Sequence, residues 1–495
     1  MTSVAYIWSA ELQRAADKLP ANVGRSSLVH GLVRALGLLD NPPDHRDTVR
    51  EGVDGQGAGS NGGHNDEASR DPEVTWLCSE SGPGEGKEGG DVEDDDDEDD
   101  EDDDEELTDP PIHGIRVVPP DLSFATPTEL RRYHDQRYLG KLSSEHSDVD
   151  YVLQSYSGDN SDSGSSADDD DDRPTKRRRE AMGLEDDCPR FPALRAYVPL
   201  VAAGTLTACR LLVQGTAKMA IVWDGGRHHA LRARASGFCY VADAVLGILL
   251  LAREGVPRSP GSKRRARILY LDMDLHYGDG VATAFTSPTH FPYPLRGRPR
   301  APQVLTLSVH HQSRIFFPPG APGLTPSDTP HPFSLSLPLA AFAHPSTYAR
   351  MWRCVEMVHS AWAPDYIVLQ LGVDGLPGDR IGQWGAWSPH GEGGSTWVVE
   401  QVMAWGVPTA VLGGGGYEHA NAARAWALAT AAIVGTDIGT DTDVPDHESI
   451  EAYAPAFTLE VPESNVPDEN TEEAFVEAER TYAILSERIR EIVAL

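Results

Sequence analysis

A short carboxylate and imidazole motif stands at the end of an apolar run in this sequence. Asp272, Asp274 and His276 occupy every second position, so their side chains point to the same side where an extended strand ends. A mixed oxygen and nitrogen set of this kind accepts Zn²⁺ readily, and a catalytic zinc needs three protein ligands and one open position. Asp274 and His276 supply two ligands. Asp374 follows another apolar run, where a carboxylate has little packing role, and we expect it to be the third.

A histidine pair and a tyrosine offer the acid–base groups that such a metal site would use. His228 and His229 follow an apolar run and two glycines, and histidines beside a metal that are not ligands are general acid–base candidates. Each needs a carboxylate on its far ring nitrogen, and Asp272 and Asp279 can fill these places. Tyr417 follows four glycines, where its phenol could donate to a carbonyl oxygen that gains negative charge.

These residues all follow apolar runs that read as strands of one parallel sheet, in an α/β fold with helices on both faces. In such sheets, ligands lie beyond the carboxyl ends of the strands, where these polar residues are expected. The predicted strands are 4–8, 219–223, 267–272, 304–309, 366–371 and 409–412. The predicted helices are 27–39, 240–254, 345–361, 395–405 and 420–434, and 287–302 is a predicted surface loop.

Two segments have compositions that cannot form a core. Residues 91–106 hold fifteen acidic side chains and one valine, and they contribute much of the net charge of −35. Residues 157–182 pass through Ser and Asp repeats into a basic cluster, Lys176–Arg179. The predicted organisation is a single catalytic domain, begun in 1–50, continued in 112–156 and completed in 183–495, with disordered insertions at 51–111 and 157–182.

The five cysteines form no C-x-x-C pair, which predicts reduced thiols in an intracellular protein. The first twenty residues lack the pattern of a signal peptide, and the longest apolar run, 245–252, is far shorter than a membrane span of roughly 20 residues. We therefore expect a soluble chain with no membrane partner.

With these motifs in place, the sequence resembles the class I zinc-dependent histone deacetylases, of the arginase/deacetylase superfamily, as a fungal-like member with acidic insertions. The matching motifs are collinear: R-S-S-L-V-H, D-C-P, G-G-R-H-H-A, A-S-G-F-C-Y, L-Y-L-D-M-D-L-H-Y-G-D-G-V, F-F-P-P-G, L-Q-L-G-V-D, L-G-G-G-G-Y and P-D-H-E. The resemblance implies a three-layer αβα sandwich with a mainly parallel central sheet.

The resemblance also implies roles for further residues. Asp187 would bind the backbone of an incoming peptide, and Arg25 would lie near an inner acetate-release cavity. A narrow tube for the acyl-lysine chain would be lined by Gly237, Phe238 and Phe317, with Ile381 at its rim. The family also binds potassium, which would be held here by Asp272, Asp274, His276, Ser308 and the backbone of Val309.

The sequence departs from the family pattern at a few positions. Tyr277 follows the ligand His276 where histidine is common, and Asp224 and Arg227 bring charge beside the histidine pair. The stretch 19–24 lacks the basic residues that help corepressor-bound members hold an inositol phosphate, whereas Arg380 matches one such contact. Corepressor membership therefore stays open.

The predicted function is zinc-dependent hydrolysis of N-acetyl-lysine on histones or other proteins, with acetate released and a role as a chromatin regulator and transcriptional repressor. The alternatives are a deacetylase of non-histone proteins or polyamines on the same fold, an arginase, and an inactive scaffold. The expected partners are acetylated histone tails and, through Lys176–Arg179, a nuclear import receptor, without sequence-specific DNA binding. The expected location is the nucleus, with a cytoplasmic fraction as an alternative. Cys188 and Cys239 lie in pocket motifs and could form a redox switch, or simply pack as small apolar groups.

Overall fold

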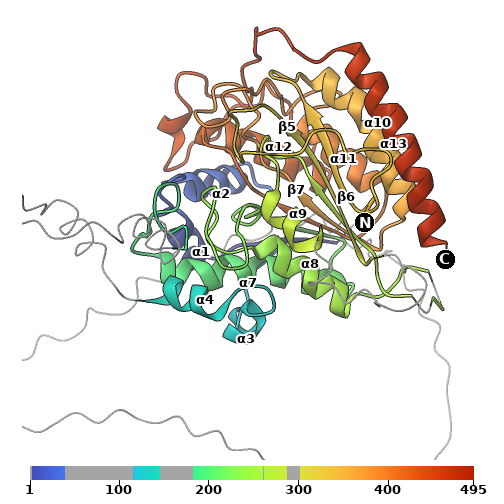
Figure 1. Ribbon diagram of the computed structural model, residues 1–495. Helices are drawn as coiled ribbons and strands as arrows, with labels where there is room; N and C mark the ends of the chain where they lie inside the picture. Colours follow the sequence, from blue (N-terminus) through green and yellow to red (C-terminus); the bar gives the residue numbers. More distant parts are fainter. Residues whose placement is uncertain are drawn as a thin grey trace, which may run out of the picture. The chain divides into compact units, whose positions relative to one another are not determined.

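The central element is an eight-stranded sheet in which every neighbouring pair is parallel, in the order β2-β1-β3-β8-β7-β4-β5-β6 (Figure 1). This computed structural model describes residues 3–39, 115–144, 182–259, 261–262, 264–286 and 302–494. The strands are β1 (Val4–Ile7), β2 (Ile115–Val118), β3 (Met219–Val222), β4 (Ile268–Asp272), β5 (Val304–His311), β6 (Ser334–Leu339), β7 (Tyr366–Gln370) and β8 (Thr409–Leu412). All six predicted strands are confirmed. The sequence analysis missed β2 and β6, which form the two edges.

Alternating side chains of the strands feed two separate hydrophobic clusters, one on each face of the sheet. In β4, Leu269 and Leu271 belong to one cluster, and Ile268 and Tyr270 belong to the other. Because both faces are covered, the strands are apolar throughout, as parallel sheets require. The structure therefore has the three layers that the sequence predicted.

Helices cover both faces (Figure 1). Residues of α2, α10, α11, α12 and α13 join the first cluster, and residues of α1, α4, α7, α8 and α9 join the second. The helices are α1 (Ala10–Ala16), α2 (Arg25–Ala35), α3 (Pro127–Leu130), α4 (Gln136–Ser143), α7 (Leu194–Val213), α8 (Asp243–Glu254), α9 (Asp279–Thr286), α10 (Pro345–Trp362), α11 (Ser395–Ala404), α12 (His419–Val434) and α13 (Glu472–Val493), with short 3₁₀ turns η2 (Leu122–Phe124) and η3 (Ile450–Tyr453). The five predicted helices correspond to α2, α8, α10, α11 and α12.

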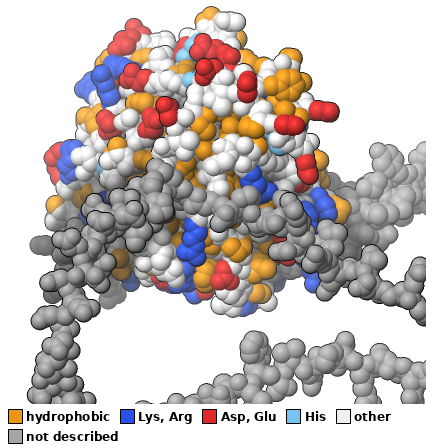
Figure 2. Space-filling view, turned by 180° about the vertical axis from the view of Figure 1, so that it is seen from behind, with side chains coloured by type: hydrophobic (Ala, Val, Ile, Leu, Met, Phe, Trp, Pro, Cys, Tyr) orange, Lys and Arg blue, Asp and Glu red, His pale blue; other side chains and the backbone are white. Residues whose placement is uncertain are grey.

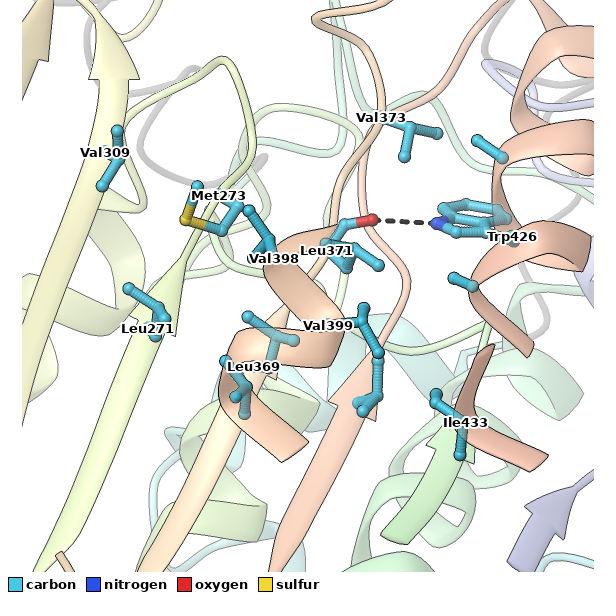
Figure 3. Close-up of a cluster of buried hydrophobic side chains, with 14 of the residues drawn as sticks. Leu271, Met273, Val309, Leu369, Leu371, Val373, Val398, Val399, Trp426 and Ile433 are labelled. Atoms are coloured by element: carbon cyan, nitrogen blue, oxygen red, sulfur yellow. Dashed lines mark hydrogen bonds between the residues drawn. The ribbon is translucent and has the colours of Figure 1, made fainter. Parts of the chain in front are cut away.

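The first cluster anchors the strand ends that carry the polar motifs (Figure 3). Met273 and Val373, each next to an aspartate of the predicted metal set, are buried in it. The indole of Trp426 on α12 stacks on Trp223 and donates a 2.8 Å hydrogen bond to the carbonyl oxygen of Leu371. Packing and a directed hydrogen bond thus fix the backbone just before Asp374.

The helix α7 has an unusually apolar composition. α7 is long and apolar enough to cross a membrane, but 72% of its apolar window is buried within the protein. It contacts α8, α1 and β3, so its apolar character is explained by packing in the second cluster. On the face turned away in Figure 1, basic and acidic side chains both occur among apolar ones (Figure 2).

Parts of the predicted organisation lie outside the described residues. These are the acidic insertion at 51–111, most of the segment at 157–182 with Lys176–Arg179, and most of the loop at 287–302. All described residues belong to one compact unit, formed by Met1–Pro42 with His113–Leu495. The limits of the two insertions remain predictions.

Candidate active site

Asp274, His276 and Asp374 meet at the carboxyl edge of the sheet, as the spacing predicted. One potential ligand atom from each lies within 4.8 Å of the others, and all three residues are buried. Nδ1 of His276 is 2.7 Å from Oδ2 of Asp374 and 3.3 Å from Oδ1 of Asp274. Asp274 and His276 follow β4, and Asp374 follows its sheet neighbour β7. The loops of two adjacent strands therefore build one donor set.

Neighbouring backbone and side-chain groups orient these carboxylates. Oδ2 of Asp274 accepts hydrogen bonds from Nε2 of Gln370 at 2.9 Å and from the amide of Gly415 at 2.8 Å. Oδ1 of Asp374 accepts from the amide of Leu275 at 3.0 Å. A Cβ atom at Gly415 would collide with the Asp374 carboxylate, so the glycine run after β8 is required for close approach.

The triad fits a divalent cation such as zinc by its donors and by its charge. Burial, together with the negative charge of Asp274, raises the pKa of Asp374 to about 7. Burial opposes protonation of His276, but Asp374 and Asp274 outweigh it and raise the pKa of His276 to about 10. Two fully buried carboxylates are costly without a compensating positive charge, and a cation supplies one.

The histidine pair lies beside the triad, with each ring held by its own carboxylate. Nδ1 of His228 is 2.9 Å from Oδ2 of Asp272, and Nδ1 of His229 is 2.7 Å from Oδ1 of Asp279. The ring centroids of the two histidines are 3.9 Å apart. The pairing that the sequence left as a possibility is thus present, and Tyr270 adds a 2.8 Å hydrogen bond to Asp272.

The surroundings of the two histidines drive their pKa values apart. Burial and the nearby His228 lower the pKa of His229 to about 4. Burial also acts against protonation of His228, but the charges of Asp274 and Asp272 prevail and raise its pKa to about 9. A cation bound by Asp274 would cancel part of this effect, whereas the hydrogen bond to Asp272 would remain. Separated pKa values in adjacent groups favour different acid and base roles.

Aromatic side chains and a glycine stand against the histidines. The ring of Phe317 is edge-to-face with His229, with centroids 4.9 Å apart, and Phe316 stacks on His276 at 4.5 Å. Gly237 has a φ of +54°, and a Cβ there would lie 2.5 Å from Cδ2 of His229. The amide of Gly237 donates a 2.6 Å hydrogen bond to Asp187. Asp187 therefore holds the turn that borders the histidines.

Tyr417 lies on the loop between β8 and α12, close to Phe238. Its ring is edge-to-face with Phe238, with centroids 5.4 Å apart. Burial, and then the negative charge of Asp374, raise the pKa of the phenol well above its usual range, so it stays a hydrogen-bond donor. Asp379 accepts hydrogen bonds from the amides of Tyr417 at 2.6 Å and of Ile381 at 2.9 Å. The backbones of Tyr417 and Ile381 are therefore tied to one carboxylate.

The sequence analysis missed several residues that position the site: Gln370, Asp243, Asp379 and Tyr270. Asp243, the first residue of α8, accepts hydrogen bonds from the amides of Gly226 and Arg227 at 2.9 and 2.8 Å, so it fixes the loop before the histidine pair. A polar residue inside an apolar stretch was the available clue for Gln370. Tyr270 contacts Asp272 two positions further along β4, whereas the contacts of Asp243 with Gly226 and of Asp379 with Tyr417 span 17 and 38 residues and have no local pattern.

The charged departures from the family pattern form a buried network behind the histidines. His30 is 3.0 Å from the Asp224 carboxylate, which also accepts a 3.1 Å hydrogen bond from Ser26. The guanidinium of Arg227 donates to the Asp224 carbonyl oxygen. Arg25 donates to carbonyl oxygens of the glycine run before Tyr417. These charges are thus satisfied within the protein.

The remaining predicted residues are also placed by the structure. Ser308 on β5 stands opposite Asp272 on β4 in the sheet register, so two of the residues named for potassium are neighbours. Tyr277 packs against His310 and lies outside the triad. Cys188 and Cys239 are buried free thiols, and burial raises the pKa of both, that of Cys239 to about 12.

A buried carboxylate and histidine donor set, flanked by two histidines with their own carboxylates, defines the class of metal-dependent hydrolases on an αβα fold. The histone deacetylase domain model matches residues 111–433. This chain is 37% identical to histone deacetylase 8 of Xenopus laevis over 290 residues, 58% of this chain and 80% of that protein. It is 32% identical to histone deacetylase 8 of Danio rerio over 382 residues, which cover 77% of this chain and 86% of the relative. Histone deacetylase RPD3 of Saccharomyces cerevisiae is 32% identical over 301 residues, 60% and 62% of the two chains.

This chain belongs to the histone deacetylase family, and it is a lysine deacetylase, a hydrolase of the acyl-lysine amide. The family is zinc-dependent, and the Asp–His–Asp triad can hold a metal ion. Its substrates are acetyl-lysine proteins. The resemblance identified from the motifs is therefore confirmed.

Proposed function

We propose that this enzyme hydrolyses the ε-N-acetyl-lysine amide of histone tails through Asp274, His276 and Asp374 as zinc ligands, with His228, His229 and Tyr417 as the groups that act on the substrate. The observation that carries this proposal is that two histidines, each hydrogen-bonded to its own carboxylate, lie beside the buried triad. A polyamine substrate is the second candidate only by family membership, and no described residue specifically favours it.

The chain's own residues have distinct roles in this reaction. Asp274, His276 and Asp374 would hold the zinc ion, which when bound would supply Lewis acidity toward the amide carbonyl and a water of lowered pKa. His229, whose low pKa keeps it neutral, takes the proton of the attacking water. His228, with its raised pKa, donates a proton to the departing lysine amine. Tyr417 donates a hydrogen bond to the carbonyl oxygen as negative charge grows there.

The aromatic rings of Phe238 and Phe317 support selection of the acetylated lysine side chain. Phe317 presents apolar surface beside His229 and Phe238 does so beside Tyr417, and Gly237 lets the backbone lie close to His229 and Phe317. An acetyl-lysine side chain is uncharged, whereas free lysine would lose the hydration of its ammonium group without gaining a partner. The lysine product should therefore bind more weakly than the acetyl-lysine substrate.

The substrate assignment can be tested by turnover of purified enzyme on acetylated histone-tail peptides, other acetyl-lysine peptides and N-acetylated polyamines. We expect the histone-tail peptides to be hydrolysed with the highest kcat/KM. Preferred turnover of the polyamines would overturn the assignment. Acetyl-lysine proteomics of cells with and without the chain would name the physiological proteins.

The ligand assignment can be tested by elemental analysis. Asp274→Asn and Asp374→Asn should each lower the zinc stoichiometry, because each removes an anionic donor from a three-ligand set. Asp187→Asn, which changes a carboxylate outside the triad, is the control and should keep its zinc. Full zinc occupancy in both triad variants would show that the ligands are misassigned.

We also propose a potassium site formed by Asp272, Asp274, His276, Ser308 and the backbone of Val309. The pairing of Asp272 with Ser308 across β4 and β5 supports it. Potassium chloride should raise the thermal midpoint more than lithium chloride at equal ionic strength. The difference should shrink in Ser308→Ala, and equal effects of both salts on the parent protein would argue against the site.

Finally, we propose that the enzyme acts in the nucleus and that Lys176–Arg179 is its import signal, read by an import receptor. Short basic runs are recognised in this way, and histones are nuclear substrates. A fluorescent fusion with these four residues changed to Ala should move to the cytoplasm while its activity in vitro stays unchanged. Continued nuclear accumulation would show that the run is not the signal.

A further inference from the structure

The outer face of α13 lines a surface groove of about 710 Å³ that is separate from the active site. One side of the helix is buried against α10 and the core through Tyr482, Leu485 and Ile489. The other side presents Glu473, Val476, Glu477, Arg480 and Ile484 to the groove, with Ser327 among its lining residues. These helix positions recur every three or four residues and therefore form one continuous stripe.

The stripe combines negative charge with exposed apolar surface. Val476 is 52% exposed and Ile484 is 42% exposed, which makes them two of the few large apolar side chains so exposed among the described residues. Glu472 and Glu479 are paired with Arg350, whereas no ion pair of Glu473 or Glu477 occurs within the described part of the chain. The two aliphatic side chains lie on the same face of α13 as the two glutamates without an ion pair, so apolar and acidic groups border one groove.

The charge around the groove is mainly negative, although Arg480 lines it and Arg488 donates a 2.7 Å hydrogen bond to the carbonyl oxygen of Ser327. Residues 460–479 contain eight acidic side chains and no lysine or arginine. Within the groove, Arg480 is the sole basic lining residue, against Glu472, Glu473 and Glu477. The groove is therefore complementary to a segment that carries several lysines or arginines together with an aliphatic residue.

The start of α13 lies at the same edge of the sheet as the active site. All strands are parallel, and Asn470, just before α13, is hydrogen-bonded to Ala340, just after β6. β6 is two strands away from β4, which carries Asp274, at about 4.8 Å per strand. With one further helix-packing distance of about 10 Å, the groove begins on the order of 20 Å from the triad. Figure 1 shows α13 on the outside of the molecule beside α10.

We propose that this α13 groove is a docking site for a Lys/Arg-rich segment of the protein substrate, at a distance from the acetyl-lysine itself. The inference rests on the proposed function, because it assumes a protein substrate with basic segments. From Glu473 to Ile484 the stripe is about 17 Å long, which fits about five residues of extended chain. A span of roughly 20 Å requires at least six or seven extended residues between the docked segment and the acetyl-lysine.

The test compares three acetyl-lysine probes: a tripeptide, a 20-residue peptide with a Lys/Arg cluster about ten residues from the acetyl-lysine, and the same peptide with the cluster replaced by serine. In Glu473→Lys/Glu477→Lys, the KM for the basic peptide should rise about five-fold or more at low salt, and this difference should largely vanish at about 0.5 M salt. The kcat for that peptide and all constants for the tripeptide should stay unchanged. Val476→Ser/Ile484→Ser should raise the same KM without the salt dependence.

The matched control is Glu487→Lys/Glu491→Lys, which makes the same charge change further along α13 and outside the groove lining. It should alter the KM of the basic peptide by less than two-fold. Equal KM values of parent and groove variant for the basic peptide, with normal tripeptide turnover, would overturn the docking site and leave the proposed function intact. Loss of tripeptide turnover in the parent enzyme would instead overturn the proposed function.

A different occupant would give another result. If the groove holds the chain's own Lys176–Arg179, changing those four residues to Ala should lower the KM for the basic peptide in the parent enzyme. The same change should have no such effect in Glu473→Lys/Glu477→Lys. That outcome would replace the substrate by an internal competitor and would overturn the proposal.

Discussion

At the scale of single residues, the site depends on groups whose chemistry is set by their neighbours. His228 and His229 are adjacent in the sequence, yet their pKa values move in opposite directions, because burial and the nearby His228 lower that of His229, whereas Asp274 and Asp272 outweigh burial at His228. Tyr417 is kept protonated by burial and by Asp374. Residue type alone would give none of these differences.

Tyr417→Phe should reduce kcat on an acetyl-lysine peptide by about 10²–10³-fold, because it removes one donor to the developing oxyanion. Zinc content and thermal midpoint should be close to those of the parent, since the ring and its contact with Phe238 remain. Tyr277→Phe changes a tyrosine outside the triad and serves as the control, which should retain most activity. Similar activity of Tyr417→Phe and the parent would refute the assigned role.

The two pocket cysteines should behave as packing residues. The thiolate is the form that reacts with peroxide, and burial makes it scarce by raising the pKa of both Cys188 and Cys239. Brief treatment with peroxide at pH 7 should leave most activity, and mass spectrometry should find both thiols reduced. Rapid inactivation that dithiothreitol reverses, and that Cys239→Ser prevents, would restore the redox-switch hypothesis.

At the scale of elements, strands and turns place these groups. Apolar runs, and the polar motifs directly after them, predicted six strands and the triad, because parallel strands bring their carboxyl ends together. Pro338 obscured β6, which tolerates proline as an edge strand, and Pro199 obscured α7. Asp243 and Asp379 act across long sequence separations, so no local pattern could have shown them.

The turn that carries Gly237 should not tolerate a side chain. Gly237→Ala puts an L-residue at a φ of +54° and presses a methyl group against His229 and Phe317. We expect a loss of kcat/KM of about 10–100-fold, since small displacements of reacting groups are costly. Gly140→Ala, in α4 with open space around it, should be active and slightly more stable. Equal kinetics of the two variants would contradict the argument.

His134 joins α4 to the start of α8 and should make stability depend on pH. Its Nε2 accepts a 2.9 Å hydrogen bond from the amide of Ala242, and burial lowers its pKa to about 4. The unfolded chain binds a proton at His134 below about pH 6.5, whereas the folded chain does not, so stability falls as the pH drops from about 6.5 to 4. At pH 5 this difference in proton binding lowers the free energy of unfolding by about 2 kcal/mol.

Urea unfolding of the parent and of His134→Gln at pH 7 and pH 5 would measure this contribution. The variant should be less stable at pH 7, because the buried hydrogen bonds are altered, but its loss between pH 7 and pH 5 should be smaller by about 2 kcal/mol. An identical loss in both proteins would assign the pH dependence to other groups.

At the scale of the whole molecule, one folded unit contains every site residue, although the sequence also contains long segments of unsuitable composition. β1 and β2 pair in register, Val4 with Ile115, across the region that includes the acidic run. Composition could identify that run but could not show which strand would follow it beside β1. The order of strands in the sheet depends on tertiary packing, which local sequence patterns do not encode.

Replacement of residues 43–112 by a Gly/Ser linker of about ten residues should preserve the fold and the active site. The triad and the histidine pair lie in the unit formed by Met1–Pro42 with His113–Leu495, so kcat on a short peptide and the thermal midpoint should change little. A Gly/Ser segment of the original length provides the matched comparison. A loss of folding in both variants would show that the segment contributes contacts, and a loss in the short one alone would show that its length matters.

The strand order also determines when the active site can exist during synthesis. β3 pairs with β1, already made, but its other neighbour β8 leaves the ribosome roughly 190 residues later, after about 10–40 s at typical rates. Throughout that interval the nascent chain has an open strand edge, and within it Asp274 and His276 lack their partner for about 100 residues until Asp374 is made. The complete donor set for the metal can therefore form only late in synthesis. Until β8 is made, the open edge of β3 can pair with another strand unless it is covered.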